Sequence, residues 1–120
     1  MGNPFVHLEL YSNDIAASKK FFAALLDWKL SDVEAGPTGN YTMINVGEGT
    51  GGGMMQNPMP NNPGGWTPYV IVEEIDAALK KAEGLGAKVM VPKTEVMGMG
   101  WIGIITDPTG VMFGFWQTKS

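Results

Sequence analysis

The sequence predicts an α+β fold made of two tandem βαβββ modules that together form a concave cleft. A chain of 120 residues corresponds to about one domain with a core of ordinary size. The expected order of one strand, one helix and three further strands occurs twice. Equivalent positions in the two copies also carry similar residues. Asp14-Ile15 corresponds to Glu74-Ile75, and Gly53-Met54-Met55-Gln56 corresponds to Gly114-Phe115-Trp116-Gln117. Two such modules set edge to edge would leave a cleft, a common kind of ligand site.

The first module covers residues 1–56. The segment Phe5–Tyr11 alternates between two faces and predicts the opening strand. Ser12-Asn13-Asp14 offers residues that cap helix N-termini, and apolar residues then recur at helical spacing over 15–26. The three remaining strands are expected at 28–33, 41–46 and 51–56, with turns at 36–40 and 47–50.

The segment 57–65 (NPMPNNPGG) is dense in Pro, Asn and Gly, and we interpret it as a linker. The second module, residues 66–120, repeats the order of the first. It begins with a strand at 66–73 and a helix at 74–85, which Gly86 would end as a C-cap residue. Its further strands are expected at 87–91, 101–105 and 111–117, with a loop at 92–98 and a turn at 107–110.

The composition argues against several classes of function. Cysteine is absent, which removes disulfides, thiolate metal ligands and a cysteine nucleophile together. All eight basic residues are lysine and the net charge is −4, so the chain offers neither a guanidinium fork nor a basic stripe for nucleic acid. With no apolar run that would span a bilayer and no leader segment, we expect a soluble, cytoplasmic protein without a membrane partner.

The chemistry of the first strand centres on His7 and Glu9, which share one of its faces. His7 is the only histidine of the chain. It is either a cleft residue that hydrogen-bonds a ligand or a structural histidine satisfied by a neighbour such as Glu9. An imidazole serves as acid or base near neutral pH, so His7 and Glu9 are the catalytic candidates. Glu9 would act as the base or orient the ring, and the alternative is a solvated strand carboxylate.

Sequence features that are typical of a known family occur in both modules. They are the opening strand up to Asp14, Phe21-Phe22, Trp28, Gly51-Gly52-Gly53, the segments 69–78 and 85–89, Asp107-Pro108-Thr109-Gly110 and Phe113-Gly114-Phe115-Trp116-Gln117. In these sequence features the chain resembles the vicinal oxygen chelate superfamily, the group of glyoxalases, bleomycin-resistance proteins and extradiol dioxygenases. It looks most like the short, uncharacterised glyoxalase-related bacterial proteins of that group. The resemblance implies a homodimer. The modules that pair with each other belong either to the same subunit or, in a swapped arrangement, to different subunits.

The resemblance also implies where a metal ion would be held. Metalloenzymes of the group use four ligands, one from the first and one from the fourth strand of each module. The matching positions are His7, Gly53, Thr67 and Gly114. A divalent catalytic ion needs about three histidine or carboxylate ligands, so we expect no intact metal site and no cofactor. A His7/Glu9 pair could recruit a divalent ion only weakly. The usual lactoylglutathione-lyase and ring-cleaving reactions, which need the ion as a Lewis acid, are therefore disfavoured.

Five residues are expected to bind a ligand around His7 and Glu9. One is Thr67, itself one of those ligand positions, and the other four share strand parity with such a position: Met55, Tyr69, Met112 and Trp116. Glycine at two positions where glutamate is usual would enlarge and neutralise the cavity, which suits an aromatic or hydrophobic small molecule. In the alternative, these side chains fill the cleft as core. The segment 97–101 (MGMGW) is either a lid or a hairpin turn whose Trp101 packs on the sheet or on a partner chain.

The sequence therefore predicts one of two alternative functions, which belong to different classes. The first is a glyoxalase-like protein without an intact metal site, which binds a small hydrophobic or aromatic molecule in an apolar cleft. The alternative is a lyase- or isomerase-type enzyme that uses His7 and Glu9 as acid and base, with or without a weakly held divalent metal. In both, the partners expected are a small-molecule ligand and a second copy of the chain.

Overall fold

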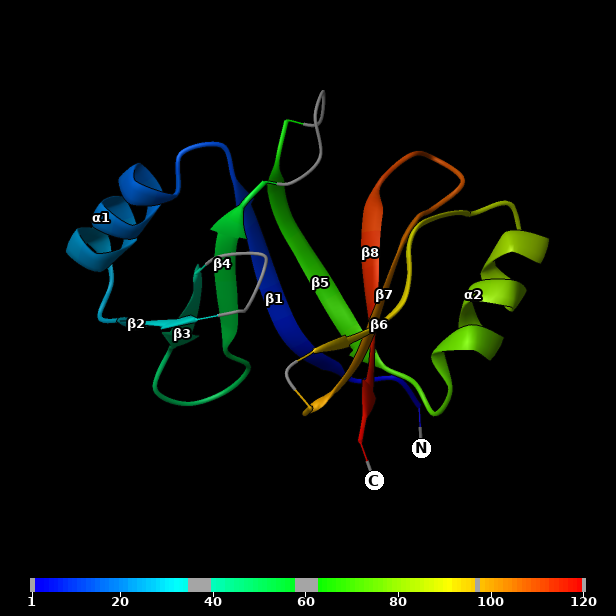
Figure 1. The fold of residues 1–120 in the computed structure, drawn as a ribbon. Coiled ribbons are helices and arrows are strands. Elements are labelled where there is room, and N and C mark those ends of the chain that lie inside the picture. The colour runs from blue at the N-terminus through cyan, green and yellow to red at the C-terminus, as the bar shows by residue number, and fades with distance from the viewer. Residues whose placement is uncertain (1, 35–39, 58–62, 97, 120) are drawn as a thin grey trace. The chain divides into compact units, whose positions relative to one another are not determined.

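The structure is a computed structural model that describes residues 2–34, 40–57, 63–96 and 98–119 (Figure 1). The chain divides into two compact units. The first unit is His7–Thr67, and the second unit joins Met1–Val6 to Pro68–Ser120. Residues 58–62 of the expected linker lie outside the described residues.

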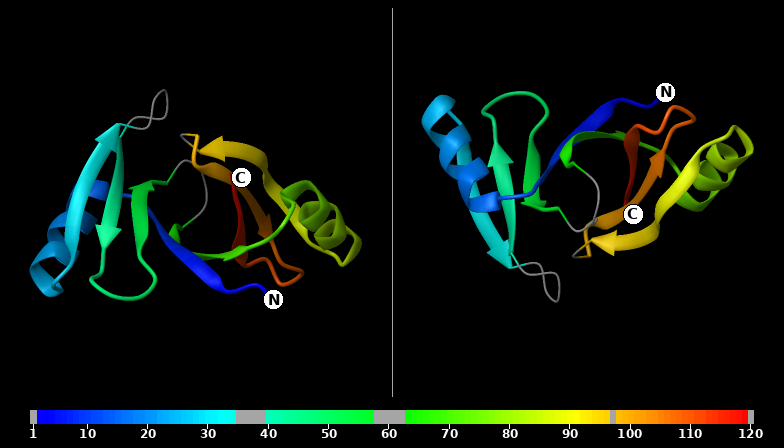
Figure 2. Two further views of the ribbon diagram at one scale, coloured as in Figure 1. Left: turned by 90° about the horizontal axis from the view of Figure 1, so that it is seen from below. Right: turned by 90° about the horizontal axis from the view of Figure 1, so that it is seen from above.

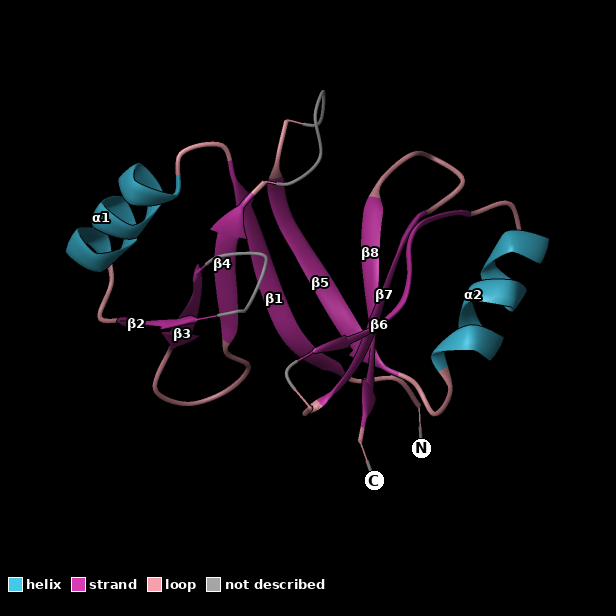
Figure 3. Ribbon diagram, viewed as in Figure 1, coloured by secondary structure: helices cyan, strands magenta, loops and turns pink. Residues whose placement is uncertain are grey.

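The first module folds as strand, helix and three strands, as expected from the sequence (Figures 1 and 3). Its elements are β1 (Phe5–Ser12), α1 (Ile15–Leu25), β2 (Lys29–Glu34), β3 (Asn40–Asn45) and β4 (Gly52–Gln56). The strands lie in the order β2-β3-β4-β1. Strand β1 runs parallel to β4, whereas the β2–β3 and β3–β4 pairs are antiparallel.

Helix α1 begins where Asp14 caps it, because the Asp14 carboxylate accepts a hydrogen bond of 3.1 Å from the Ala17 N–H. The helix covers one face of its sheet, where Leu10, Ile44 and Met54 are buried. Partly buried hydrophobic residues pack against this cluster. They are Ile15 and Phe22 of α1, Leu30 of β2, and Trp28 and Val46. We call the opposite face, which carries His7, Glu9, Tyr41 and Gly53, the site face.

The second module repeats this plan, and each helix lies beside the sheet of its own module (Figure 2). Its elements are β5 (Gly65–Ile71), α2 (Ile75–Gly84), β6 (Lys88–Val96), β7 (Gly100–Thr106) and β8 (Met112–Thr118), with strand order β5-β8-β7-β6. Glu74 caps α2 by accepting a 3.1 Å hydrogen bond from the Asp76 N–H. The buried core of this module is Ile75, Leu79, Ala82 and Ile105. The α+β fold of two βαβββ modules is thus confirmed.

The expectation of a loop at 92–98 is wrong, because β6 continues through Pro92 to Val96. Strand β6 is outermost in the order of its sheet, and an edge strand tolerates the N–H that proline lacks. Its pairing with β7 shifts register between Val89 and Val91 and again between Val91 and Thr94, so the proline sits in an irregular stretch.

Within the segment 97–101, the described residues 98–101 lead into β7, the antiparallel partner of β6. Residues 98 and 99 form a turn, and Met97 lies outside the described residues. Trp101 stands in β7 and packs against the core cluster that contains Ile75 and Leu79. The hairpin interpretation, with Trp101 on its own sheet, therefore describes this segment.

Candidate functional site

Three polar side chains meet on the site face of the first unit: His7 and Glu9 from β1 and Tyr41 from β3. The His7 Nε2 atom lies 2.9 Å from Glu9 Oε1 and 3.0 Å from the Tyr41 hydroxyl. The Tyr41 hydroxyl donates a hydrogen bond of 2.6 Å to the same Glu9 Oε1 atom. The two catalytic candidates are therefore in contact, and a tyrosine that sequence analysis did not select completes the cluster.

The register of three strands explains how Tyr41 reaches Glu9. Glu9 of β1 stands opposite Gly53 of β4, and Gly53 in turn stands opposite Met43 of β3. Tyr41 lies two residues before Met43 and so points to the same face. A Cβ atom on Gly53 would collide with the Tyr41 hydroxyl. The missing side chain at position 53 therefore makes room for the phenol to cross β4.

The Glu9 carboxylate is buried with only one of its oxygens satisfied. Glu9 is 5% exposed, and its Oε2 atom has no hydrogen-bond partner among the described residues. A carboxylate accepts hydrogen bonds at both oxygens, and a buried acceptor left without one costs about 1–3 kcal/mol or more. An unsatisfied oxygen of this kind is what a hydrogen-bond donor on a ligand would complete.

Tyr41 stays protonated and acts as a donor. Burial raises the pKa of its phenol far above the ordinary value, and the negative charge of Glu9 and the hydrogen bond to Glu9 raise that pKa further. Because the phenol keeps its proton at neutral pH, it fixes Glu9 Oε1. The other oxygen, Oε2, has no hydrogen-bond partner among the described residues.

The second module contains a matching arrangement. Gly114 of β8 stands opposite Tyr69 of β5, and a Cβ atom on Gly114 would collide with the Tyr69 ring. At both positions where the resemblance implies a glutamate ligand, a glycine is thus covered by a tyrosine ring. The expected enlargement of the cavity at Gly53 and Gly114 is therefore wrong, because Tyr41 and Tyr69 take up that space.

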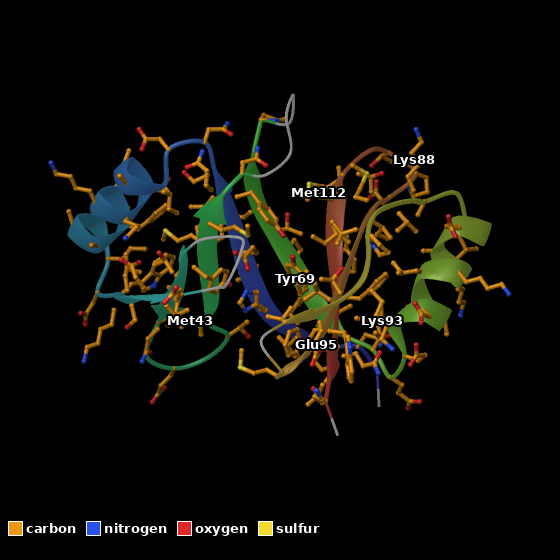
Figure 4. The ribbon with its side chains drawn as sticks, in the orientation of Figure 1. Met43, Tyr69, Lys88, Lys93, Glu95 and Met112 are labelled. Atoms are coloured by element: carbon orange, nitrogen blue, oxygen red, sulfur yellow. The ribbon has the colours of Figure 1, made fainter. Side chains whose placement is uncertain are left out.

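The structure places the five expected ligand-binding residues in two groups. In the first unit, Met55 stands on β4 with the parity of Gly53, and Thr67 is buried in β5. In the second unit, Tyr69, Met112 and Trp116 lie on the face opposite α2. Figure 4 marks Tyr69 on β5 and Met112 at the start of β8. That the two groups line one cleft stays a prediction.

The residues present do not fit the four-ligand metal site that the resemblance implies. Two of its positions are the tyrosine-covered glycines 53 and 114. A third is Thr67, a neutral hydroxyl, and the fourth is His7, whose Nε2 atom already contacts Glu9 and Tyr41. In the described ranges no three His, Cys, Asp or Glu side chains gather as a set that would hold an ion.

Tyr41 could be found from sequence only through the glycine across from it. A residue without a side chain on a central strand leaves space that a long neighbour can fill, and Tyr41 is the aromatic residue of the adjoining strand. Parity along one strand, which identified His7 and Glu9, does not reveal a partner on another strand.

Comparison with known proteins matches this fold to one family. The family model described as the Glyoxalase/Bleomycin resistance protein/Dioxygenase superfamily matches residues 5–115. Neither helix in the described part of the chain has the length and apolar character needed to cross a membrane.

Curated proteins that are similar to this chain include CFP32 and DnrV. CFP32 of Mycobacterium tuberculosis, which carries the name of a glyoxylase, is 32% identical over 117 residues, covering 93% of this chain and 44% of that protein. The anthracycline biosynthesis protein DnrV of Streptomyces peucetius is 27% identical over 123 residues, covering 91% of this chain and 45% of its own length. The chain therefore spans less than half the length of these relatives.

Solved structures share the fold at low sequence identity. A hypothetical protein from Bacillus halodurans superposes with a TM-score of 0.73 at 14% identity, over 100% of this chain and 97% of that one. Methylmalonyl-CoA epimerase from Mycobacterium tuberculosis gives a TM-score of 0.68 at 14% identity, over 97% of this chain and 88% of its own. With two βαβββ modules and a family match over residues 5–115, the chain belongs to the glyoxalase/bleomycin resistance protein/dioxygenase superfamily.

Proposed function

We propose that the chain binds a small hydrophobic or aromatic molecule on the site face of its first module, without a metal ion. The observation that carries this proposal is the buried Oε2 atom of Glu9, which has no hydrogen-bond partner among the described residues. A ligand with a hydroxyl or amine group would donate a hydrogen bond to Oε2 and remove the penalty of the unsatisfied acceptor.

The surroundings of Glu9 support a ligand with an apolar body. Met43 and Met55 stand on the neighbouring strands β3 and β4 with the parity of the site face. Methionine adapts its shape to apolar ligands. The oriented carboxylate would then set the direction of the bound molecule, and the methionines would supply contact area.

A second candidate is an isomerase- or lyase-type enzyme, favoured by the contact between His7 and Glu9. Glu9 Oε2 would take a proton from a carbon next to a carbonyl and return it to the product, so that no oxidant or reductant is needed. His7 has 29% of its side chain exposed, so it would exchange protons with solvent while it touches Glu9. The fold shared with a methylmalonyl-CoA epimerase is consistent with this class of reaction.

Ligand-induced thermal shifts test the binding proposal. A library of small aromatic alcohols, phenols and amines is expected to raise the melting temperature of the wild-type chain. The substitution Glu9→Gln should remove these shifts, because an amide no longer offers a charged acceptor. The matched control is Glu83→Gln on the exposed side of α2, which should keep them. Equal shifts in wild type and Glu9→Gln would contradict the proposal.

We also propose that two copies of the chain associate through α1. None of the residues of α1 is buried, whereas α2 buries Ile75, Leu79 and Ala82. Phe21 and Leu25 are 58% and 59% exposed and lie one helical turn apart. Aromatic residues exposed in this way are characteristic of interfaces.

The aromatic contacts of α1 extend this apolar surface. The Phe21 ring packs at 5.0 Å on Phe22, and Phe22 packs at 5.7 Å on Trp66, which is itself exposed. The curated relatives are more than twice as long as the segment they share with this chain, so each has room for a second unit of this size. A second copy of this chain is the occupant that we assign to the surface.

A further inference from the structure

A hollow of about 410 Å³ opens over the outer strands β2 and β3 of the first unit. Volumes of roughly 300–1,000 Å³ are usual for sites that bind small molecules. The lining comes from these two strands and from the loop that joins β3 to β4. His7, Glu9 and Tyr41 do not line the hollow, so it is separate from the cluster that they form.

The strand register explains why polar side chains gather in this hollow. Met43 stands opposite Gly53 and points to the site face, and Asn45, two residues further along β3, points to the same face. Ser31 and Lys29 of β2 are the direct partners of Met43 and Asn45. Because paired side chains lie about 5 Å apart, Lys29, Ser31 and Asn45 surround one small area.

The polar side chains of the hollow offer a positive charge and hydrogen-bond donors. Lys29 has no ion-pair partner within the described part of the chain. The Asn45 Oδ1 atom accepts a 2.9 Å hydrogen bond from the Gly47 N–H, which leaves the amide N–H groups of Asn45 to donate. The Ser31 hydroxyl can donate as well. A cation with neutral donors beside it is an arrangement that favours an oxyanion.

Negative charge is kept out of the hollow. Lys29 is the only charged residue among those that line it. Asp32 belongs to the same strand but is the partner of the buried Thr42 and points to the opposite face. There its carboxylate accepts hydrogen bonds of 2.6 Å from the Thr42 hydroxyl and 2.7 Å from the Lys19 ammonium. The charge of Lys29 is therefore not cancelled by its acidic neighbour on β2.

The loop beside the hollow exposes its backbone. Gly47, Gly49 and Gly51 all line the hollow and have no side chain to shield the main chain. Gly47 and Gly49 both have a φ of 96°, a conformation that glycine adopts without strain. Glu48, which lies between them, is exposed and does not line the hollow. An anion can thus approach this loop closely.

We propose that this hollow binds the oxyanion of a small molecule, a carboxylate or phosphate group held by Lys29, Asn45 and Ser31. Met43, which is 40% exposed and is labelled in Figure 4, supplies an apolar contact for the rest of the molecule. The inference goes beyond the proposed function, because none of the residues that hold the anion belongs to the Glu9 cluster.

The probes are benzoate and phenyl phosphate, with neutral benzamide as the comparison that lacks the charge. Their binding to the full chain is followed by ¹H–¹⁵N NMR, in which the backbone amide signals of Gly47, Gly49 and Gly51 report on the loop. At low salt, at least one of the anions is expected to shift these signals and to bind about tenfold more tightly than benzamide. The anion that binds more tightly identifies the group. High salt should weaken this binding.

Variants test whether Lys29 is the cation. Lys29→Met should bind the anion no more tightly than benzamide, and Lys29→Arg should retain most of the preference. Lys88→Met, at an exposed lysine of β6 in the other unit, is the matched control and should behave as wild type. Glu48→Gln removes a nearby negative charge and should tighten anion binding about twofold.

Three results would overturn the inference. They are equal affinities of wild type for the anions and benzamide, a preference that survives Lys29→Met, and signal changes that leave the loop 47–51 unaffected. Lys29→Met should keep the thermal shifts that neutral aromatic alcohols produce, because Glu9 is intact in that variant. Loss of those shifts in a folded Lys29→Met chain would contradict the separation of the two sites.

Discussion

Tyr41 donates a 2.6 Å hydrogen bond to Glu9 across the strand that lies between them, at the point where that strand carries a glycine. The contact joins residues that are 32 positions apart in the chain. It occupies Oε1 of Glu9, whereas Oε2 has no hydrogen-bond partner among the described residues.

The glycine between these two residues should not tolerate a side chain. Gly53→Ala places a Cβ atom against the Tyr41 hydroxyl, so we expect a loss of about 1–3 kcal/mol in the free energy of unfolding. Urea denaturation measures this loss. The matched control is Gly84→Ala at the end of α2, where a Cβ atom meets nothing within 4 Å. That helical position should gain up to about 1 kcal/mol, and a Gly53→Ala chain as stable as wild type would show that Tyr41 does not occupy the space.

Stability at alkaline pH should depend on Tyr41. Burial and the charge of Glu9 raise the pKa of its phenol in the folded chain above the ordinary value of 10.0. Above about pH 10 the unfolded chain loses this proton while the folded chain keeps it, so the free energy of unfolding should fall as pH rises. The slope for one proton is about 1.4 kcal/mol per pH unit.

The variant Tyr41→Phe isolates that contribution. It should unfold with about 1–2 kcal/mol less free energy at neutral pH, because Glu9 loses a donor. The difference in stability between wild type and Tyr41→Phe should then shrink above about pH 10, as the wild-type chain gives up its advantage. Parallel pH profiles of the two proteins would mean that Tyr41 titrates normally.

The apolar surface of α1 should control association. Leu25→Lys puts a charge into this surface, and sedimentation equilibrium is expected to show a dimer for wild type and a monomer for the variant. The control is Leu85→Lys, which changes a leucine that is 71% exposed next to α2 and should remain dimeric. A wild-type chain that is monomeric at micromolar concentration, or a dimer that survives Leu25→Lys, would contradict the assignment.

Local patterns were sufficient to predict most of the fold. Alternation along β1 and the Asp14 cap of α1 act within a few residues, and the structure has both where they were expected. Pro92 misled the prediction of a loop, since only the edge position of β6 permits a proline within a strand.

The candidate site was predicted only in part, for a physical reason. His7 and Glu9 lie on one strand, so their shared face follows from the period of two. The position of Tyr41 depends on the register of β3 with β4 and of β4 with β1, and single-strand periodicity does not determine either. The tyrosine rings over Gly53 and Gly114 were not predicted from the sequence for the same reason.

The most direct measurement is a calorimetric titration of 4-hydroxyphenyl ligands into protein that has been treated with EDTA and checked for metal content by elemental analysis. We expect the metal-free wild-type chain to bind these ligands as tightly as untreated protein, and Glu9→Gln to bind them about tenfold more weakly. Binding that EDTA abolishes and one equivalent of a divalent ion restores would contradict the account, because Glu9 would then act as a metal ligand.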